Sequence, residues 1–242
     1  MFDHVTIRVA DRDASERFYN TVLSALGVPE LPSGEHYAGW DDFSLAVAAG
    51  EEPVTRGLHI GFVAPSHAAA DAFWLAGTEI GYEDDGAPGP RAQYGDDYYG
   101  AFLLDPDGNS IEAVHHGHLR PGPFDHLWIR VADVAAASRF YELIASWSRY
   151  PLDDQRDGFA HFRGSDGSFS LVADGPPTEN LHLAFSASDN RTVQEFHRAA
   201  VEAGYRDNGP AGERAVYHAG YYGAFVLDPD GNNIEVVNHH RD

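Results

Sequence analysis

"YYGAFLLDPDGNSIEAV" at residues 98–114 recurs almost unchanged as "YYGAFVLDPDGNNIEVV" at residues 221–237. In each copy a strand-like run precedes "DPDG", in which proline at the second position and glycine at the fourth favour a type I turn. A second short strand follows the turn and carries a glutamate, Glu112 or Glu235. The pattern therefore predicts a β-hairpin that occurs twice, each time with an acidic residue on its second strand.

The repetition extends over nearly the whole chain. "FDHVTIRVAD" at residues 2–11 recurs as "FDHLWIRVAD" at residues 124–133, and two copies in the same order indicate two homologous domains. We expect these domains at residues 1–118 and 122–242. The segment "GHLRPGP" between them contains two prolines and two glycines, which suits a short linker.

Within each copy, the hydrophobic pattern predicts two units, each a strand, a helix and further strands. Val5, Ile7 and Val9 alternate with polar residues, which is the pattern of a strand with one buried face. In the first copy we expect helices at 13–26 and 66–80 and further strands at 36–40, 43–47, 58–63, 98–105 and 110–114. This order favours an α+β domain with helices on one face of its sheet, leaving the other face free to curve around a cavity.

Composition limits the possible partners. The 242 residues carry 38 acidic and 16 basic side chains, all of the latter arginine, for a formal net charge of −22. Such a chain repels phosphate backbones and anionic membranes, and it has no apolar run of roughly 18 residues. We therefore expect a cytoplasmic protein that binds a small molecule, binds neither nucleic acid nor membranes, and is a monomer or a homodimer. The absence of cysteine excludes disulfides and thiolate ligands.

Strand alternation places metal-binding groups on the face opposite the helices. In the first copy His4, His59 and Glu112 alternate with apolar residues on three different strands. The second copy repeats this arrangement with His126, His182 and Glu235. A lone histidine on a polar strand face is usually only solvated, but three such groups that recur together indicate ligands. We expect one site in each domain, for a divalent metal ion such as Fe, Mn, Co, Ni or Zn.

The patterns "FDHVTIRV…RFY", "GLHIGFV" and "YYGAFLLDPDGNSIE", each present twice, resemble the vicinal oxygen chelate superfamily. That superfamily includes glyoxalases, extradiol dioxygenases, fosfomycin-resistance enzymes and bleomycin resistance proteins. The resemblance implies paired βαβββ modules that form a U-shaped mixed sheet around a metal ion. It also implies that His4, His59 and Glu112 are metal ligands in the first copy, and His126, His182 and Glu235 in the second.

A glyoxalase-like lyase or isomerase is the first functional hypothesis. The resemblance implies that Arg8 and Arg130, each four residues after the first histidine of its copy, hold an anionic part of the substrate. Glu112 or Glu235 would then leave the metal to move a proton. The chain departs from glyoxalase I at the fourth ligand position, where Ala46 and Val172 replace the usual glutamate.

An extradiol-type ring-cleaving dioxygenase is the second hypothesis, because such enzymes resemble this chain in their tandem domains and their three ligands. Phe102 and Phe225 stand where these enzymes usually carry a tyrosine. His218 is the candidate acid–base residue, and Gly95 is its counterpart in the first copy. A non-catalytic drug-binding protein is the third hypothesis, against which the intact ligand set counts.

Two further groups of residues have expected positions. Tyr99 and Tyr222 should line the cavities and contact substrate, or fill the cavity walls. The runs "HHGH" at 115–118 and "HH" at 239–240 follow the last strand of each copy, and we expect these histidines at the surface.

Overall fold

The computed structural model describes residues 2–34, 37–49, 53–117 and 121–240. The first copy contains β1 (Phe2–Val9), α1 (Arg12–Ala25), β2 (Tyr37–Trp40), β3 (Phe43–Val47), β4 (Leu58–Val63), α2 (His67–Glu79), β5 (Asp84–Pro90), β6 (Tyr99–Leu104) and β7 (Ser110–His115). The second contains β8 (Phe124–Arg130), α3 (Val134–Ser148), β9 (Leu152–Arg156), β10 (Phe159–Arg163), β11 (Ser168–Val172), β12 (His182–Ser186), α4 (Asn190–Glu202), β13 (Arg206–Glu213), β14 (Tyr222–Leu227) and β15 (Asn233–Asn238). The fold is α+β, as the sequence predicts.

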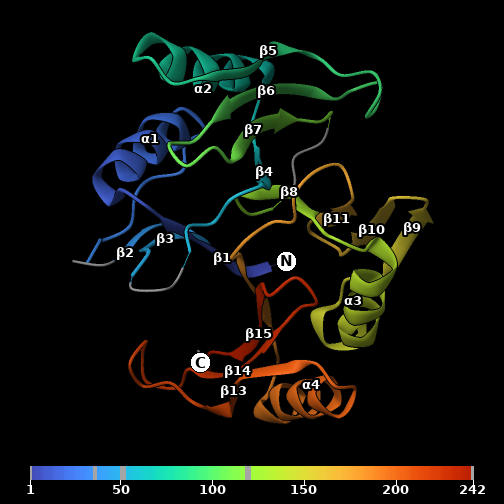
Figure 1. Cartoon of the computed structure of the whole chain (residues 1–242). Coiled ribbons are helices and arrows are strands. Elements are labelled where there is room, and N and C mark those ends of the chain that lie inside the picture. The colour runs from blue at the N-terminus through green and yellow to red at the C-terminus, as the bar shows by residue number, and fades with distance from the viewer. Residues whose placement is uncertain (1, 35–36, 50–52, 118–120, 241–242) are drawn as a thin grey trace.

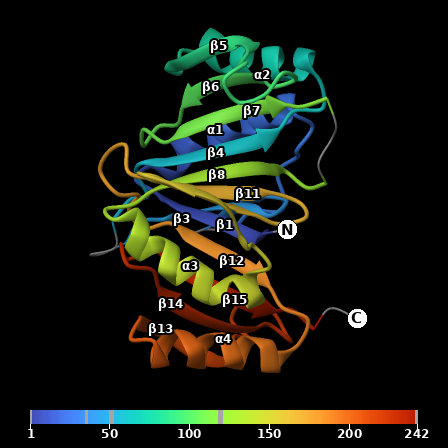
Figure 2. The same cartoon turned by 90° about the vertical axis from the view of Figure 1, so that its right-hand side faces the viewer.

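The strands form two mixed sheets, and each sheet combines strands from both sequence copies. Sheet A has the order β13-β14-β15-β12-β1-β3-β2, and sheet B has the order β5-β6-β7-β4-β8-β11-β10-β9. The first module of one copy therefore shares a sheet with the second module of the other, as the stacked strands of Figure 2 show. The expectation that each copy builds a sheet around its own site is wrong.

Two antiparallel strand pairs join the copies. In sheet A, β1 pairs with β12 so that His4 lies opposite Ala184. In sheet B, β4 pairs with β8 so that Gly61 lies opposite His126. Because side chains alternate between the two faces of a strand, this register puts histidines of different copies on one face of the same sheet.

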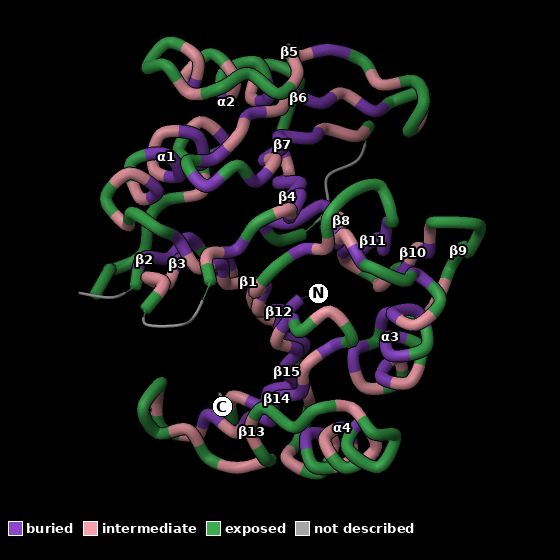
Figure 3. Tube along the Cα trace, viewed as in Figure 1, coloured by how far each residue is buried: buried purple, intermediate pink, exposed green. Residues whose placement is uncertain are grey.

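Aromatic side chains fill the core between the two sheets. Phe2 of β1 stacks on Tyr150 with ring centroids 4.8 Å apart, and Phe43 of sheet A packs edge-on against Phe62 of sheet B at 5.4 Å. Helices α1 and α2 pack together on one side of the molecule, and α3 and α4 pack together on the other (Figure 1). Buried residues concentrate along the central strands, while much of the helices' outer surface is exposed (Figure 3). The opposite sheet faces are thereby left to form cavities.

The repeated "DPDG" segment forms the predicted turn between β6 and β7. The amide of Gly108 donates to the Asp105 carbonyl, and the Asp105 carboxylate accepts from the amides of Asp107 and Asn109. The same carboxylate accepts from the hydroxyl of Tyr19 on α1 at 2.8 Å. The second copy repeats this contact with Tyr141 and Asp228 at 3.0 Å, so these parts of the repeated motifs stabilise the fold.

The sequence reading did not foresee β5 and its counterpart β13. Both are edge strands with glycine-rich and proline-containing sequences, "DDGAPGP" and "RDNGPAGE". Such segments lack the alternating apolar residues that reveal a strand, and edge positions tolerate proline. Within the described residues, no helix has the length and apolar character needed to cross a bilayer. The proposed domain limits and linker include residues outside the described ranges and stay predictions.

Candidate metal sites

Six side chains meet as two triads. Site A contains His4 of β1, His182 of β12 and Glu235 of β15, and site B contains His59 of β4, Glu112 of β7 and His126 of β8. These are the six residues that the sequence singles out, but their grouping by copy is wrong. His4 lies with two residues of the second copy, and His126 lies with two residues of the first. The cause is the pairing of β1 with β12 and of β4 with β8.

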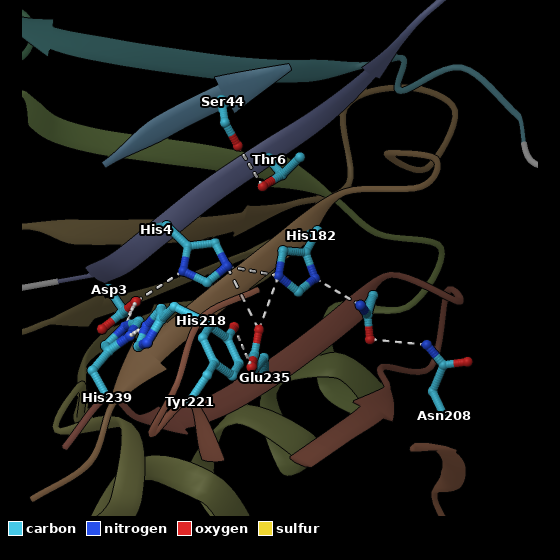
Figure 4. A network of polar contacts seen from close by, with 11 residues as sticks. Asp3, His4, Thr6, Ser44, His182, Asn208, His218, Tyr221, Glu235 and His239 are labelled. Atoms are coloured by element: carbon cyan, nitrogen blue, oxygen red, sulfur yellow. Dashed lines mark hydrogen bonds and ion pairs between the residues drawn. The ribbon is translucent and has the colours of Figure 1, made fainter. Parts of the chain in front are cut away.

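The potential ligand atoms of site A converge closely (Figure 4). Nε2 of His4 lies 3.0 Å from Nε2 of His182, and Oε2 of Glu235 lies 3.5 and 3.1 Å from these two nitrogens. Neighbouring ligands of one ion lie about 3 to 3.5 Å apart when each bond is about 2.1 Å long. The Oε2 atom is buried and accepts no hydrogen bond within the described structure. Site A therefore fits a single divalent cation.

Site B has nearly the same internal geometry. Nε2 of His59 lies 3.1 Å from Nε2 of His126, and Oε2 of Glu112 lies 3.1 and 3.4 Å from these nitrogens. All three residues are buried. Two neutral imidazoles and one carboxylate with convergent atoms suit the same class of cation in both sites.

An aspartate orients one histidine of each triad, the histidine that directly follows it in the sequence. Oδ1 of Asp3 accepts from Nδ1 of His4 at 2.8 Å, and Oδ1 of Asp125 accepts from Nδ1 of His126 at 2.9 Å. An ionised carboxylate can only accept, so Nδ1 of each ring carries a proton and, in the neutral ring, Nε2 presents its lone pair to the triad.

The other histidine of each triad, His59 in site B and His182 in site A, is supported differently in the two sites. In site B, Nδ1 of His59 lies 3.0 Å from the hydroxyl of Ser110, which donates to Asp85 at 2.7 Å. The hydroxyl proton is thereby engaged, and Ser110 accepts the Nδ1 proton of His59. In site A, Nδ1 of His182 instead accepts from the side-chain nitrogen of Asn233 at 2.6 Å. That amide contacts Asn208, so no carboxylate supports His182 in this chain of contacts (Figure 4).

A buried tyrosine and a glycine hold each glutamate. The hydroxyls of Tyr98 and Tyr221 donate to Oε1 of Glu112 and Glu235 respectively, each at 2.7 Å. Gly100 lies directly beside Oε1 of Glu112, where a Cβ atom would collide with it. Oε1 is therefore fixed and Oε2 is free to face the imidazoles. The sequence prediction did not include either tyrosine. Strand alternation nevertheless places both on the same side as the cavity-facing residues of the strand that follows.

Burial shifts the pKa values in site B in opposite directions. Burial raises the pKa of Glu112 to about 7, against the opposing effects of His126 and Tyr98. Burial, with a smaller contribution from the charge of Arg130, lowers the pKa of His59 to about 4 against the opposing charge of Asp85. A cation at site B therefore competes with a proton on Glu112 near neutral pH, while His59 is already neutral.

In site A the charged form of one imidazole is favoured. Burial lowers the pKa of His4, but the hydrogen bond that His4 donates to Asp3 and the charge of Glu235 outweigh burial and raise it. Burial lowers the pKa of His182. A cation at this site would replace the proton that Asp3 and Glu235 stabilise on His4.

Of the histidines expected at the surface, His116 and His239 are partly buried, whereas His240 is exposed as expected. His239 donates to Asp3 at 2.8 Å and contacts His218 at 2.9 Å, so a chain of three side chains leads away from His4 (Figure 4). In site B, His116 lies 3.1 Å from Asp125. Both His116 and His239 are partly buried behind a candidate ligand. His118 lies outside the described residues.

The two arginines predicted to bind substrate, Arg8 and Arg130, have different surroundings. Arg8 lines the cavity of site A, called cavity A, and Ala46 lines it as well. Arg130 lies outside the lining of cavity B, the cavity that reaches site B at His126, and donates to Asp174 and to the carbonyl of Gly57. Its predicted contact with substrate is therefore not supported, because this guanidinium joins the two copies instead.

Tyr99 and Tyr222 face away from the cavities. The hydroxyl of Tyr99 donates to Asp71 of α2 at 2.7 Å, and its ring stacks on His67. The Tyr222 hydroxyl accepts from Gln194 of α4 at 2.9 Å. The expectation that these tyrosines contact substrate is wrong, because they lie on the helix side of the strands.

The two cavities differ in size and in the position of the candidate acid–base histidine. Cavity A has a volume of about 810 Å³ and includes His218, whose Nδ1 donates to the carbonyl of Ala219. Cavity B has a volume of about 590 Å³. Both volumes fall within the range of small-molecule sites.

A family model described as the Glyoxalase/Bleomycin resistance protein/Dioxygenase superfamily matches residues 1–113 and again residues 123–236. The chain belongs to this superfamily. The tandem arrangement of two such domains agrees with the predicted fold.

Solved structures show the same fold at low sequence identity. A mutant of glyoxalase I from Zea mays matches with a TM-score of 0.71 and 19% identity, over 98% of this chain and 92% of that chain. A candidate dioxygenase from Bacillus subtilis matches with a TM-score of 0.68 and 15% identity, over 99% of this chain and 85% of that chain. A search of curated proteins finds no match. These likenesses establish the fold and leave the reaction to the site.

Proposed function

We propose that the protein is a metal-dependent enzyme of the glyoxalase-like lyase or isomerase type, with one divalent cation in each triad and a small oxygen-chelating substrate. The convergence of two imidazole Nε2 atoms and one carboxylate Oε2 within 3.5 Å, found twice, is the observation that carries this proposal. Iron(II), manganese, cobalt, nickel and zinc all accept such a donor set.

The bound cation would supply electrostatic stabilisation of negative charge on a substrate oxygen. The chain's own residues then divide the remaining tasks. Tyr98 and Tyr221 hold Oε1 of each glutamate, so that an Oε2 atom that has left the cation would be placed to take a proton from the substrate carbon and return it to a neighbouring atom. Burial raises the pKa of Glu112 to about 7, where a carboxylate is a suitable general base at neutral pH. Arg8 lines cavity A and can pair with a substrate carboxylate there.

The dioxygenase alternative has weaker support from the residues around the triads. Its candidate acid–base residue, His218, contacts His239 and a backbone carbonyl, and its counterpart in the first copy is a glycine, Gly95. A non-catalytic drug-binding function does not explain why two complete triads are present. It also does not explain why the Nδ1 atoms of their histidines have hydrogen-bond partners.

Metal stoichiometry and activity test the proposal in sequence. Untagged protein, stripped with a chelator and reconstituted with Zn²⁺, Mn²⁺, Ni²⁺, Co²⁺ or Fe²⁺, should bind two ions per chain. The loaded protein should remove the adduct of methylglyoxal and a thiol, followed by its absorbance, and replacing either glutamate with alanine should lower the rate. Tyr99→Phe, outside both cavities, is the control. Binding of no metal would refute the proposal, while oxygen uptake with catechol in the Fe²⁺ form would favour the dioxygenase.

A further inference from the structure

The walls of the two cavities differ beside the triads. In sheet A, Thr6 and Gly39 lie on either side of Ser44, and Thr6 bonds the Ser44 hydroxyl at 2.8 Å. In sheet B, the equivalent positions on either side of Ser170 carry Trp128 and His161. Trp128 therefore stands where cavity A has Thr6, and His161 stands where the ring of Tyr37 covers Gly39, while cavity B is the smaller of the two.

Trp128 lies next to the candidate ligands of site B. Its ring centroid is 5.8 Å from that of His59 and 6.4 Å from that of His126, and all three residues come from the paired strands β4 and β8. Tyr94 meets the indole edge-on at 6.0 Å. If a ligand binds at the triad through its oxygen atoms, the rest of that ligand would extend alongside the indole ring of Trp128.

Part of the remaining wall of cavity B is flat and aromatic, beside the charged side chains of Asp153, Asp154 and Arg163. The rings of Phe159 and His161 are nearly parallel, with an interplanar angle of 9° and centroids 6.3 Å apart. The guanidinium of Arg156 lies over the Phe159 ring at 4.5 Å. Burial lowers the pKa of His161, so this ring is neutral at physiological pH and presents an uncharged aromatic face.

We propose that site B favours oxygen-chelating ligands that carry a flat aromatic or conjugated group more strongly than site A does. This rests on the proposed function, because it requires a cation in each triad. The discriminating residues are Trp128, with His161 and Phe159 behind it. The two sites of the duplicated chain would then differ in ligand preference while sharing one set of metal-binding residues.

A pair of hydroxamates with the same chelating group tests the selectivity. Glu235→Ala leaves only site B and Glu112→Ala leaves only site A, and each single-site protein is loaded with Zn²⁺. Dissociation constants of benzohydroxamate and acetohydroxamate are then measured by calorimetry, with metal-free protein as the blank. We expect the preference for benzohydroxamate to be at least tenfold greater at site B than at site A. Trp128→Thr in the site-B protein should abolish this excess.

The reciprocal variant makes the test independent of any structural damage from removing the indole. Thr6→Trp in the site-A protein should create a preference for benzohydroxamate. Equal preferences at the two sites, with zinc bound at both, would overturn the selectivity alone. A failure of both single-site proteins to bind zinc would instead refute the metal-dependent function on which the selectivity rests.

Discussion

Sites A and B hold the same three donors in nearly the same geometry, but their surroundings differ. In both, an aspartate orients one histidine and a tyrosine holds the glutamate. Beyond these contacts, Ser110 and Asp85 support a histidine of site B where site A uses Asn233. The comparison teaches that the two copies share the donors and their nearest supports, while the cavity walls and outer contacts have diverged.

The divergence also separates the electrostatics of the two sites. Site B combines a carboxyl group whose pKa is raised with an imidazole whose pKa is lowered. In site A, the pKa of His4 is raised by Asp3 and Glu235 despite burial. The same donor set can therefore hold its proton on a carboxyl group in one site and on an imidazole in the other.

Double substitutions test the comparison of the two sites most directly, because their effect on metal binding depends on which residues share an ion. In H4A/H182A both changes fall in site A, so we expect one ion per chain to bind with unchanged affinity. In H4A/H59A the changes fall in different sites, and each site should lose more than about 100-fold in affinity. Metal analysis and competition with a chromophoric chelator measure both quantities.

The opposite pattern would contradict the exchanged triads. If each copy held its own site, H4A/H59A would keep one ion at full affinity and H4A/H182A would keep none. Circular dichroism of the four single variants controls for misfolding, and H126A/H59A is the matched pair for site B.

The pH dependence of stability would sharpen the comparison at site B. Burial raises the Glu112 pKa from its ordinary 4.5 to about 7, so between these pH values the native state binds a proton that the unfolded state has lost. Stability from this group is therefore present below pH 4.5 and is lost as pH rises to about 7. The loss is about 3 kcal/mol, at about 1.4 kcal/mol per pH unit.

Glu112→Gln removes this titration and leaves a neutral side chain of similar shape. The stability difference between Glu112→Gln and the original protein should grow by about 3 kcal/mol from pH 4.5 to 7.5, in urea unfolding with a metal chelator present. Titrating groups that do not contact Glu112 contribute equally to both proteins and cancel. A difference that stays constant over this range would show that Glu112 titrates normally, and Glu235→Gln is the matched substitution in site A.

Strand alternation was enough to identify the six candidate ligands, because the side-chain direction is a local property of each strand. It also distinguishes Tyr98 from Tyr99: the former is in phase with Gly100 and Phe102, and Phe102 pairs with Glu112 in the hairpin. The same rule places Tyr99 on the opposite side of the strand, so alternation argues against its predicted contact with substrate.

The grouping of the ligands could not be read in this way. It depends on β1 pairing with β12 rather than with β4, and both strands carry a histidine between apolar residues. Two similar copies offer similar strands, so local patterns do not distinguish pairing within a copy from pairing between copies. The role of Arg130 was hidden for the same reason, since its partner Gly57 belongs to the other copy.

The smallest expected effect concerns the histidines behind site A. His239 contacts Asp3, which orients His4, so His239→Ala should lower the zinc affinity of site A by about tenfold. His218 contacts His239 and lies one contact further out, so His218→Ala should lower it by only a few-fold. Chelator competition in the Glu112→Ala background isolates site A. His116→Ala in the Glu235→Ala background is the counterpart, because His116 contacts the Asp125 that orients His126. Equal losses from His218→Ala and His239→Ala would show that the histidines act as one unit, and no loss from either would show that Asp3 orients His4 without them.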